Sequence, residues 1–183
     1  MTETTKPEAQ MGNPVAIGSD TYNKVLQHYY TEALLLDNIR LQEWGATLAE
    51  DLQYMVPVRQ TRTVEDIEAS YVRSVQHMDD DYGSIMGRIM RLSGKSAWSE
   101  NPPSRIRRFV SNVQVFETEK SDEYTSINYL LITRNRFDDD FFDLIPCQRS
   151  DVLRVVDGGF KLARREVLID QAVLGTPNLS IFL

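Results

Sequence analysis

Apolar residues recur at helical spacing along the N-terminal part of the chain. Between residues 20 and 36 they fall every three or four positions, so they form one stripe along a predicted helix that Ser19 or Asp20 can cap. Further helices are predicted over about residues 41–51 and 83–92, because apolar residues share one face there too.

Alternating apolar residues indicate strands elsewhere. Residues 52–60 alternate in this way, and Pro57 predicts an edge position or a bulge, because proline cannot donate a ladder hydrogen bond. Residues 62–82 are polar and are predicted to be irregular, whereas Asp157-Gly158-Gly159 is a hairpin-turn signal. In the second half of the chain we predict four longer strands, at about residues 105–118, 123–137, 140–156 and 159–170.

The order of these elements predicts the fold class. Helices followed by hairpin-linked strands favour an α+β domain, with the N-terminal helices packed on one face of an antiparallel sheet. We expect one domain over residues 19–183 and a flexible arm over residues 1–18, which are polar and carry proline and glycine.

The predicted strand at 105–118 is apolar on both faces. One face carries Phe109, Val113 and Val115, and the other carries Ile106, Val110 and Phe116. A strand of this kind is covered on both sides. The helices can cover one face, so we expect the contents of a pocket or another subunit against the other.

Composition and charge narrow the possible partners. Among 183 residues, 20 are basic and 27 acidic, giving a formal charge of −7 that repels phosphate backbones, so no nucleic-acid partner is expected. The one cysteine, Cys147, excludes a disulfide within the chain and a cysteine-ligated zinc or iron–sulfur site, and we expect it in the core. We also expect no secretory signal, no membrane association and a cytoplasmic location, because no apolar run reaches the length of a membrane span.

Histidines with nearby acids are the candidates for catalytic chemistry. His28 lies on the first predicted helix, where packing accounts for it. His77 precedes Asp79, Asp80 and Asp81, an arrangement that can form a metal site or an acid–base pair. Acids before a helix are also favoured by the helix dipole, and this is the simpler interpretation. The sequence has no glycine-rich phosphate loop, GxSxG motif or CxxC motif.

Arginines that follow a proline corner give the densest functional signal. Asn101-Pro102-Pro103 leads rigidly into a predicted strand that carries Arg105, Arg107 and Arg108. These arginines suit an anion site, but equally many acids lie on the neighbouring strands, so ion pairs within the chain or across a subunit contact are favoured. We therefore predict a subunit-interface or structural role for Trp98, Asn101, Pro102, Pro103, Arg105, Arg107, Arg108, Arg149, Asp151 and Arg154.

Seven segments of the sequence carry a family resemblance. They are EALLLDNIRLQEW (32–44), DLQYMVPVR (51–59), HMDDD (77–81), GRIMRL (87–92), AWSENPPSRIRRFVSNV (97–113), RSDVLR (149–154) and LIDQAVLGTPNLSIFL (168–183). In this order they span nearly the whole chain after the arm. The chain resembles the small (beta) subunit of bacterial aromatic-ring-hydroxylating dioxygenases, the Rieske non-haem iron enzymes.

The resemblance implies a cystatin-like or NTF2-like α+β fold with a strongly curved antiparallel sheet. It also implies an α3β3 hexamer in which the large (alpha) subunit holds a Rieske [2Fe–2S] cluster and a mononuclear Fe(II). Such a complex converts an aromatic hydrocarbon into a cis-dihydrodiol with O2 and electrons from NAD(P)H. The family's small subunit carries no catalytic residue, so no catalytic, cofactor-binding or metal-binding residue is expected here. One cysteine and two histidines are indeed too few to ligate the Rieske cluster, and too few to ligate the two iron centres together.

Three further expectations accompany this resemblance. The alternative function is a stand-alone NTF2-like dehydratase or isomerase that would use His77, Asp79 or Asp81, and Tyr82 as acid–base groups. Residues 144–148 depart from the family pattern, and Pro146 predicts a bulge or an edge there. The HMDDD segment favours a fused-ring arene such as naphthalene as the substrate.

Overall fold

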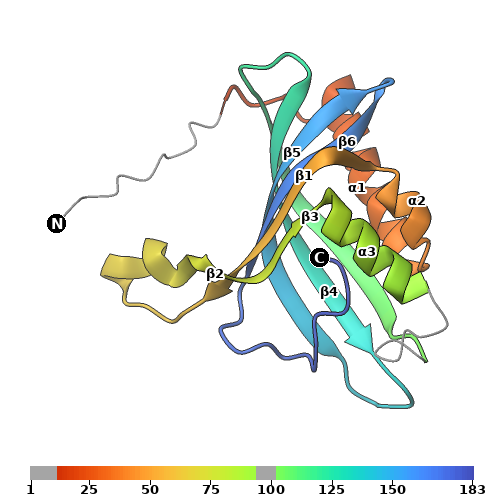
Figure 1. Ribbon diagram of the computed structural model, residues 1–183. Coiled ribbons are helices and arrows are strands. Elements are labelled where there is room, and N and C mark those ends of the chain that lie inside the picture. The colour runs from red at the N-terminus through yellow and green to blue at the C-terminus, as the bar shows by residue number, and fades with distance from the viewer. Residues whose placement is uncertain (1–11, 94–101) are drawn as a thin grey trace.

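The computed structural model describes residues 12–93 and 102–183. Within them, six strands form one sheet in the spatial order β2-β1-β6-β5-β4-β3 (Figure 1). Neighbouring strands are antiparallel except β1 and β6, which run parallel. This pair departs from the predicted antiparallel arrangement because its strands are far apart in the sequence and no hairpin joins them. The strands are β1 (Leu48–Arg59), β2 (Tyr71–Asp81), β3 (Arg105–Glu117), β4 (Glu123–Asn135), β5 (Asp143–Val156) and β6 (Gly159–Ile169).

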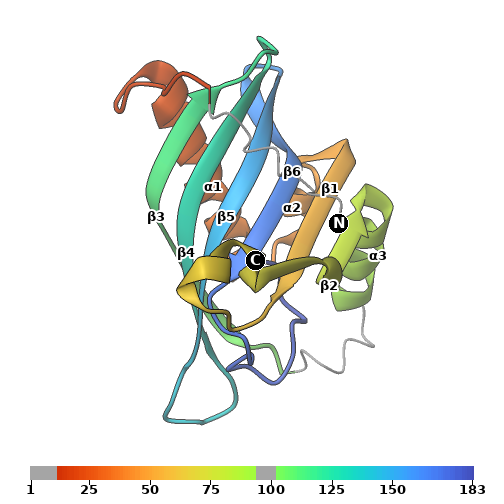
Figure 2. The same cartoon turned by 90° about the vertical axis from the view of Figure 1, so that its left-hand side faces the viewer.

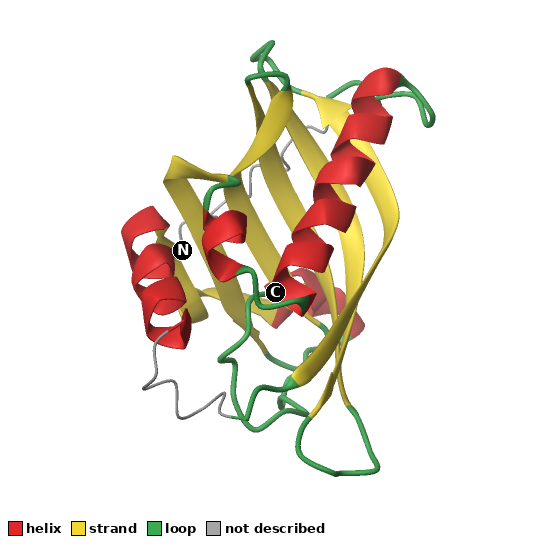
Figure 3. Ribbon diagram, turned by 90° about the vertical axis from the view of Figure 1, so that its right-hand side faces the viewer, coloured by secondary structure: helices red, strands yellow, loops and turns green. Residues whose placement is uncertain are grey.

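The α-helices of the described chain lie on one side of this curved sheet (Figure 3). They are α1 (Asp20–Asp37), α2 (Leu41–Gly45) and α3 (Tyr82–Ser93), and a 3-10 helix, η1 (Val64–Ser70), precedes β2. Figure 2 shows the opposite side, where the strands face the viewer and α1 lies behind them. The predicted α+β arrangement is therefore confirmed.

The core fills the space between the helices and the concave face of the sheet. The apolar stripe predicted on α1 supplies Tyr22, Val25 and Leu36, all buried. Ser19 starts this helix as predicted, because its hydroxyl oxygen accepts a hydrogen bond of 3.2 Å from the backbone N–H of Tyr22. The core fixes α1 across the sheet, since burying each such side chain contributes about 1.5–3 kcal/mol.

Two segments differ from their predicted structure. The second helix ends at Gly45, and Leu48 already belongs to β1, because the backbone N–H of Leu162 donates to the carbonyl of Thr47 at 2.9 Å and draws this segment into the sheet. Residues 62–82, predicted to be irregular, contain η1 and β2. β2 is an edge strand whose side chains are mostly exposed, so it lacks the apolar alternation of a half-buried strand.

A bulge in β3 changes which side chains share a face. The register against β4 shifts after Ser111, and Asn112 has a positive φ of 51°. The extra residue turns Val113 and Val115 to the buried face, while Phe109 lies on the opposite face and is 55% exposed. The predicted grouping of these three residues on one face is therefore wrong.

The two strand prolines lie where a missing N–H is tolerated. The register between β1 and β2 shifts on both sides of Pro57, which confirms the predicted bulge. Pro146 lies one residue beyond the last pair of β5 with β6, Cys147 with Ile169. The carbonyl oxygen of Pro146 still accepts a hydrogen bond of 3.0 Å from the backbone N–H of Asp170. Residues 143–145 pair with β4 and not with β6, so the predicted edge begins at this proline.

The described end of the predicted arm lies along β3. The backbone N–H of Val15 donates to the carbonyl of Val115 at 2.8 Å, and that of Glu117 donates to the carbonyl of Asn13 at 2.9 Å. Residues 13–15 thus pair with β3 along the edge of the sheet. The boundary between arm and domain at residue 18 stays a prediction.

Candidate functional site

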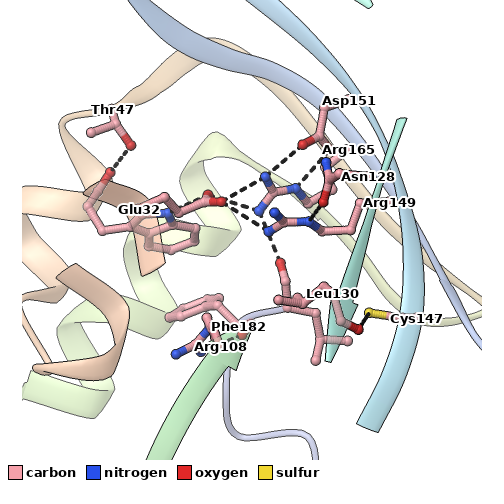
Figure 4. Close-up of polar contacts among 12 residues, drawn as sticks. Glu32, Thr47, Arg108, Asn128, Leu130, Cys147, Arg149, Asp151, Arg165 and Phe182 are labelled. Carbon is pink, nitrogen blue, oxygen red and sulfur yellow. Dashed lines mark hydrogen bonds and ion pairs between the residues drawn. The ribbon is translucent and has the colours of Figure 1, made fainter. Parts of the chain in front are cut away.

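Four charged side chains meet in the interior, between α1 and the sheet (Figure 4). Glu32 of α1 is central: Arg165 of β6 donates to both of its carboxylate oxygens at 2.9 Å, and Arg149 of β5 donates to it at 3.0 Å. Trp44 Nε1 donates to the same carboxylate at 3.1 Å. Asp151 of β5 accepts two more hydrogen bonds from Arg165, at 2.9 and 2.8 Å. We call Glu32, Arg149, Asp151 and Arg165 the buried ion cluster.

The buried ion cluster is balanced in charge, with two guanidinium groups and two carboxylates. Burial raises the pKa of Glu32, but the guanidinium groups of Arg165 and Arg149 outweigh burial and hold that pKa well below its ordinary value. Burial lowers the pKa of Arg165, but Asp151 and Glu32 outweigh it and raise that pKa well above its ordinary value. All four groups are paired in bidentate or shared hydrogen bonds, which buried charges require. The cluster therefore ties α1 to β5 and β6.

Packing accounts for His28, as the sequence suggested. Its ring lies edge-on to the rings of Tyr29 and Phe160, with centroids 5.7 and 6.4 Å apart. Desolvation lowers its pKa, so the imidazole is neutral at neutral pH. A neutral, packed imidazole fills space between α1 and β6.

Cys147 is a core residue, as predicted, and is 3% exposed. Its thiol lies 3.5 Å from the carbonyl oxygen of Leu130, to which it donates. Burial raises the pKa of Cys147 to about 11, so the thiol is protonated at neutral pH and is a poor nucleophile.

We predict that Cys147 of the native chain resists a thiol reagent. Because the thiol is both buried and protonated, native protein at pH 8 is expected to react with 5,5′-dithiobis(2-nitrobenzoate) at least about 100-fold more slowly than protein unfolded in guanidinium chloride. Absorbance of the released thiolate measures both rates. Equal rates in the two states would show that the native thiol is accessible.

Three of the residues predicted at an interface are paired inside this chain. Arg149 and Asp151 belong to the buried ion cluster. Arg108 is also buried and donates to the Asp37 carboxylate at 2.6 Å. Because these three residues are buried within one chain, a structural role is favoured for them over a role at a subunit interface.

Arg154 forms the cross-strand ion pair that the charge pattern indicated. It pairs in register with Glu123 of β4, to which it donates at 2.9 Å, and it also donates to Asp51 of β1 at 2.8 Å. These two carboxylates raise its pKa. Arg154 thus links β4 and β1 across β5 and β6.

The remaining residues of the proline corner lie at the surface or outside the described residues. Arg105 is exposed and donates to the Asn135 side chain and to the carbonyl of Phe137. Arg107 is exposed, and its guanidinium donates to the adjacent backbone carbonyl of Ile106 at 3.0 Å. Pro102 and Pro103 are exposed, whereas Trp98 and Asn101 lie outside the described residues.

The candidate acid–base groups do not converge on a pocket. His77, Asp79 and Asp81 share the exposed side of the edge strand β2. Asp81 instead accepts a hydrogen bond of 2.7 Å from the backbone N–H of Ser84 at the start of α3, which confirms that an acid favours this helix start. In the described ranges 12–93 and 102–183, no group of three or more histidine, cysteine or acidic residues is placed to hold a metal ion.

Apolar side chains gather on the uncovered face of the sheet. Phe109 of β3 lies directly opposite Leu131 of β4, which in turn lies opposite Pro146 of β5. Tyr129 and Leu144 flank this row, and both are about half exposed. We call Phe109, Tyr129, Leu131 and Leu144 the outer-face patch. Clustered exposed apolar residues of this kind mark contact surfaces.

Comparison with known proteins identifies the family. Residues 31–176 match the family model described as ring hydroxylating beta subunit. The chain belongs to this family. This beta subunit is 39% identical to the benzene 1,2-dioxygenase subunit beta of Pseudomonas putida and 37% identical to the biphenyl 2,3-dioxygenase subunit beta of Rhodococcus jostii (strain RHA1), and each alignment covers 92% of both chains.

The fold of this beta subunit also matches a solved structure. A structure of naphthalene 1,2-dioxygenase with indole bound in the active site superposes with a TM-score of 0.79, covering 91% of this chain and 89% of the other at 22% identity. The predicted NTF2-like α+β fold is confirmed. Among the described residues of this beta subunit, no helix combines the length and apolarity needed to cross a bilayer.

Sequence reasoning missed Glu32 and Arg165 as key residues of the beta subunit. The signal for Glu32 was present, because it lies three residues after Tyr29 and four before Leu36, within the apolar stripe of α1. A charge at such a position needs a buried partner. Which arginines supply that partner depends on the order of the strands in the sheet, and local sequence patterns do not reveal this order.

Proposed function

We propose that this chain is the non-catalytic, structural subunit of an α3β3 dioxygenase that cis-dihydroxylates an aromatic hydrocarbon, using O2 and electrons from NAD(P)H. The family match over residues 31–176 carries this proposal. A beta subunit implies an alpha subunit as its partner. The relatives of nearly the same length are named as beta subunits of dioxygenases. Further beta subunits would complete the hexamer, which we place in the cytoplasm.

The Rieske cluster and the mononuclear Fe(II) are assigned to the alpha subunit because this chain's donors do not fit them. A Rieske centre takes two cysteines and two histidines, and the iron site takes two more histidines and a carboxylate. This chain has one cysteine and two histidines. Cys147 is a protonated core thiol, and His28 and His77 lie on separate elements, α1 and β2.

Two surfaces are the proposed contacts with other subunits. The outer-face patch offers apolar area on β3, β4 and β5 that the helices leave uncovered (Figure 2). The exposed Arg105 and Arg107 lie at the start of β3, the edge strand beside this patch. Apolar and arginine-rich surfaces are enriched in subunit interfaces. We place Trp98, Asn101, Pro102 and Pro103 at the same contact.

The substrate is proposed as an aromatic hydrocarbon without a fused-ring preference. The relatives at 37–39% identity are named for benzene and biphenyl, whereas the naphthalene enzyme is 22% identical. These values do not favour the fused-ring arene suggested by the HMDDD segment. The alternative function as a dehydratase or isomerase is not supported, because the relatives are dioxygenase subunits and His77, Asp79 and Asp81 lie on an exposed strand face.

Co-expression with a dioxygenase alpha subunit tests this function. We expect native mass spectrometry to show a complex of three alpha and three beta subunits that hydroxylates an arene, while the beta subunit alone binds no stoichiometric iron. Arene oxidation by the beta subunit alone would contradict the structural role.

Charge reversal at the proline corner tests the proposed contact. Arg107→Glu is expected to lower the yield of assembled complex at least about tenfold, because a carboxylate replaces an exposed guanidinium at the contact. The matched control is Arg62→Glu, an exposed arginine outside both proposed surfaces, which should assemble normally. Normal assembly of Arg107→Glu with lost turnover would contradict the proposal.

A further inference from the structure

The last residues of the sequence lie in the interior although they belong to no strand or helix. After Asp170 the chain continues without regular secondary structure. Nevertheless Ile181, Phe182 and Leu183 are only 5, 2 and 0% exposed. Figure 3 places this end of the chain among the helices, on the concave side of the sheet. In the described ranges 12–93 and 102–183, no strand pairs with residues 181–183, so the segment can leave without opening the sheet.

Side chains from three elements contact Phe182 of this segment. The Phe182 ring packs against the Trp44 ring, with centroids 4.4 Å apart. The guanidinium of Arg88, a residue of α3, lies 4.6 Å from the centroid of the Phe182 ring. Arg108 donates to the carbonyl oxygen of Phe182 at 2.7 Å. An aromatic ring thus contacts both an indole and a cation, beside an oxygen that accepts from an arginine.

Leu183 is held through its backbone as well. Arg165 and the Tyr54 hydroxyl donate to its carbonyl oxygen at 3.1 and 2.8 Å. The backbone N–H of Leu183 also donates to the Tyr54 hydroxyl at 2.8 Å. The contacts with Arg165 and Arg108 go to backbone oxygens, which a carbonyl or carboxylate compound can imitate. The site therefore recognises a class of chemistry rather than one amino-acid sequence.

A pocket adjoins the segment and shares its walls. Residues 180–182 form one side of this pocket, which is partly open to solvent. The other sides are mainly apolar and come from α1, α2, α3 and β3, with Leu36, Leu41 and Ile106 among them. Arg108 also lines this pocket, and its Nε is buried without a hydrogen-bond partner among the described residues. A buried donor left unpaired here points to a further acceptor.

We propose that this interior is a binding site for a small apolar molecule with an aromatic ring and a carbonyl or carboxylate oxygen, and that residues 181–183 occupy it as an internal ligand. Trp44 and Arg88 hold the ring, while Arg108, Arg165 and Tyr54 bind oxygens. The adjoining pocket is the mouth of the site. When the segment is displaced, the mouth and the interior join.

Removal of residues 181–183 tests the proposal, with N-acetyl-phenylalanyl-leucine as the probe. Isothermal titration is expected to show saturable 1:1 binding to the shortened chain, at least about tenfold tighter than to the full chain, whose site is filled. N-acetyl-seryl-leucine, which lacks the ring, should bind the shortened chain at least about tenfold more weakly. Equal affinity for both chains, or no binding to a folded shortened chain, would overturn the proposal.

A second variant covers the case in which the shortened chain does not fold. Phe182→Ala in the full chain removes only the ring, and toluene is the probe for the vacated space. Toluene is expected to raise the Tm of this variant and to leave the Tm of Val173→Ala, an exposed position, unchanged. An unchanged Tm of Phe182→Ala in toluene would also overturn the proposal.

Discussion

Replacing Glu32 by alanine is expected to destabilise the folded chain by about 3–5 kcal/mol, the largest effect predicted for one substitution. Glu32 accepts hydrogen bonds from Arg165, Arg149 and Trp44. Its removal leaves Asp151, which pairs with Arg165, as the one carboxylate of the cluster for two buried guanidinium groups. Urea unfolding followed by circular dichroism measures the loss as a lower midpoint at an unchanged slope.

An exposed ion pair provides the control. Arg40 donates to Glu43 three residues away, and both side chains are about half exposed. Glu43→Ala is therefore expected to leave the urea midpoint unchanged, because water replaces the lost partner. An unchanged midpoint for Glu32→Ala would show that the buried ion cluster does not stabilise the fold.

The same carboxylate predicts how stability depends on pH. The pKa of Glu32 in the folded chain is lowered from its ordinary value of 4.5, so its contribution is fully present above about pH 4.5 and is lost as the pH falls towards the folded pKa. Unfolding free energies at pH 7 and pH 3 should therefore differ less in Glu32→Gln than in the wild type. The same difference in both proteins would assign acid sensitivity to other groups.

The double substitution Phe109→Asp and Leu131→Asp is expected to abolish assembly with other subunits while leaving the fold intact. The two side chains are 55 and 39% exposed and lie opposite each other on β3 and β4. Two adjacent carboxylates would be desolvated in any contact that covers the outer-face patch, at a cost of several kcal/mol. Native mass spectrometry after co-expression with the alpha subunit measures the loss, and circular dichroism checks the fold.

Met90→Asp is the matched control for this surface. Met90 is 71% exposed on α3, away from the outer face of the sheet. Its substitution should leave assembly unchanged. If the double variant assembled as well as Met90→Asp, the outer-face patch would not be a subunit contact.

Local sequence patterns were sufficient where one element determines the structure. The spacing of Tyr22, Val25 and Leu36 identified α1 and its buried face, and Ser19 identified its start. Pro57 identified a bulge from a property of the residue itself. Local patterns failed where the pairing of strands determines the structure. β2 carries little apolar signal because it lies at the edge of the sheet. The bulge at Asn112 reverses which side chains of β3 face the core.

The sequence alone determined the α+β class, the family, and the lack of ligands for a Rieske cluster, because these follow from local periodicity, ordered motifs and residue counts. Only the tertiary structure decided which charges meet. Glu32 lies far along the chain from Arg149 and Arg165, and the strand order and direction bring them together. It also divided the arginine run by strand alternation, with Arg108 turned into the core and Arg107 to the surface. Such long-range pairing is absent from local patterns, since it depends on how the strands of the whole sheet align.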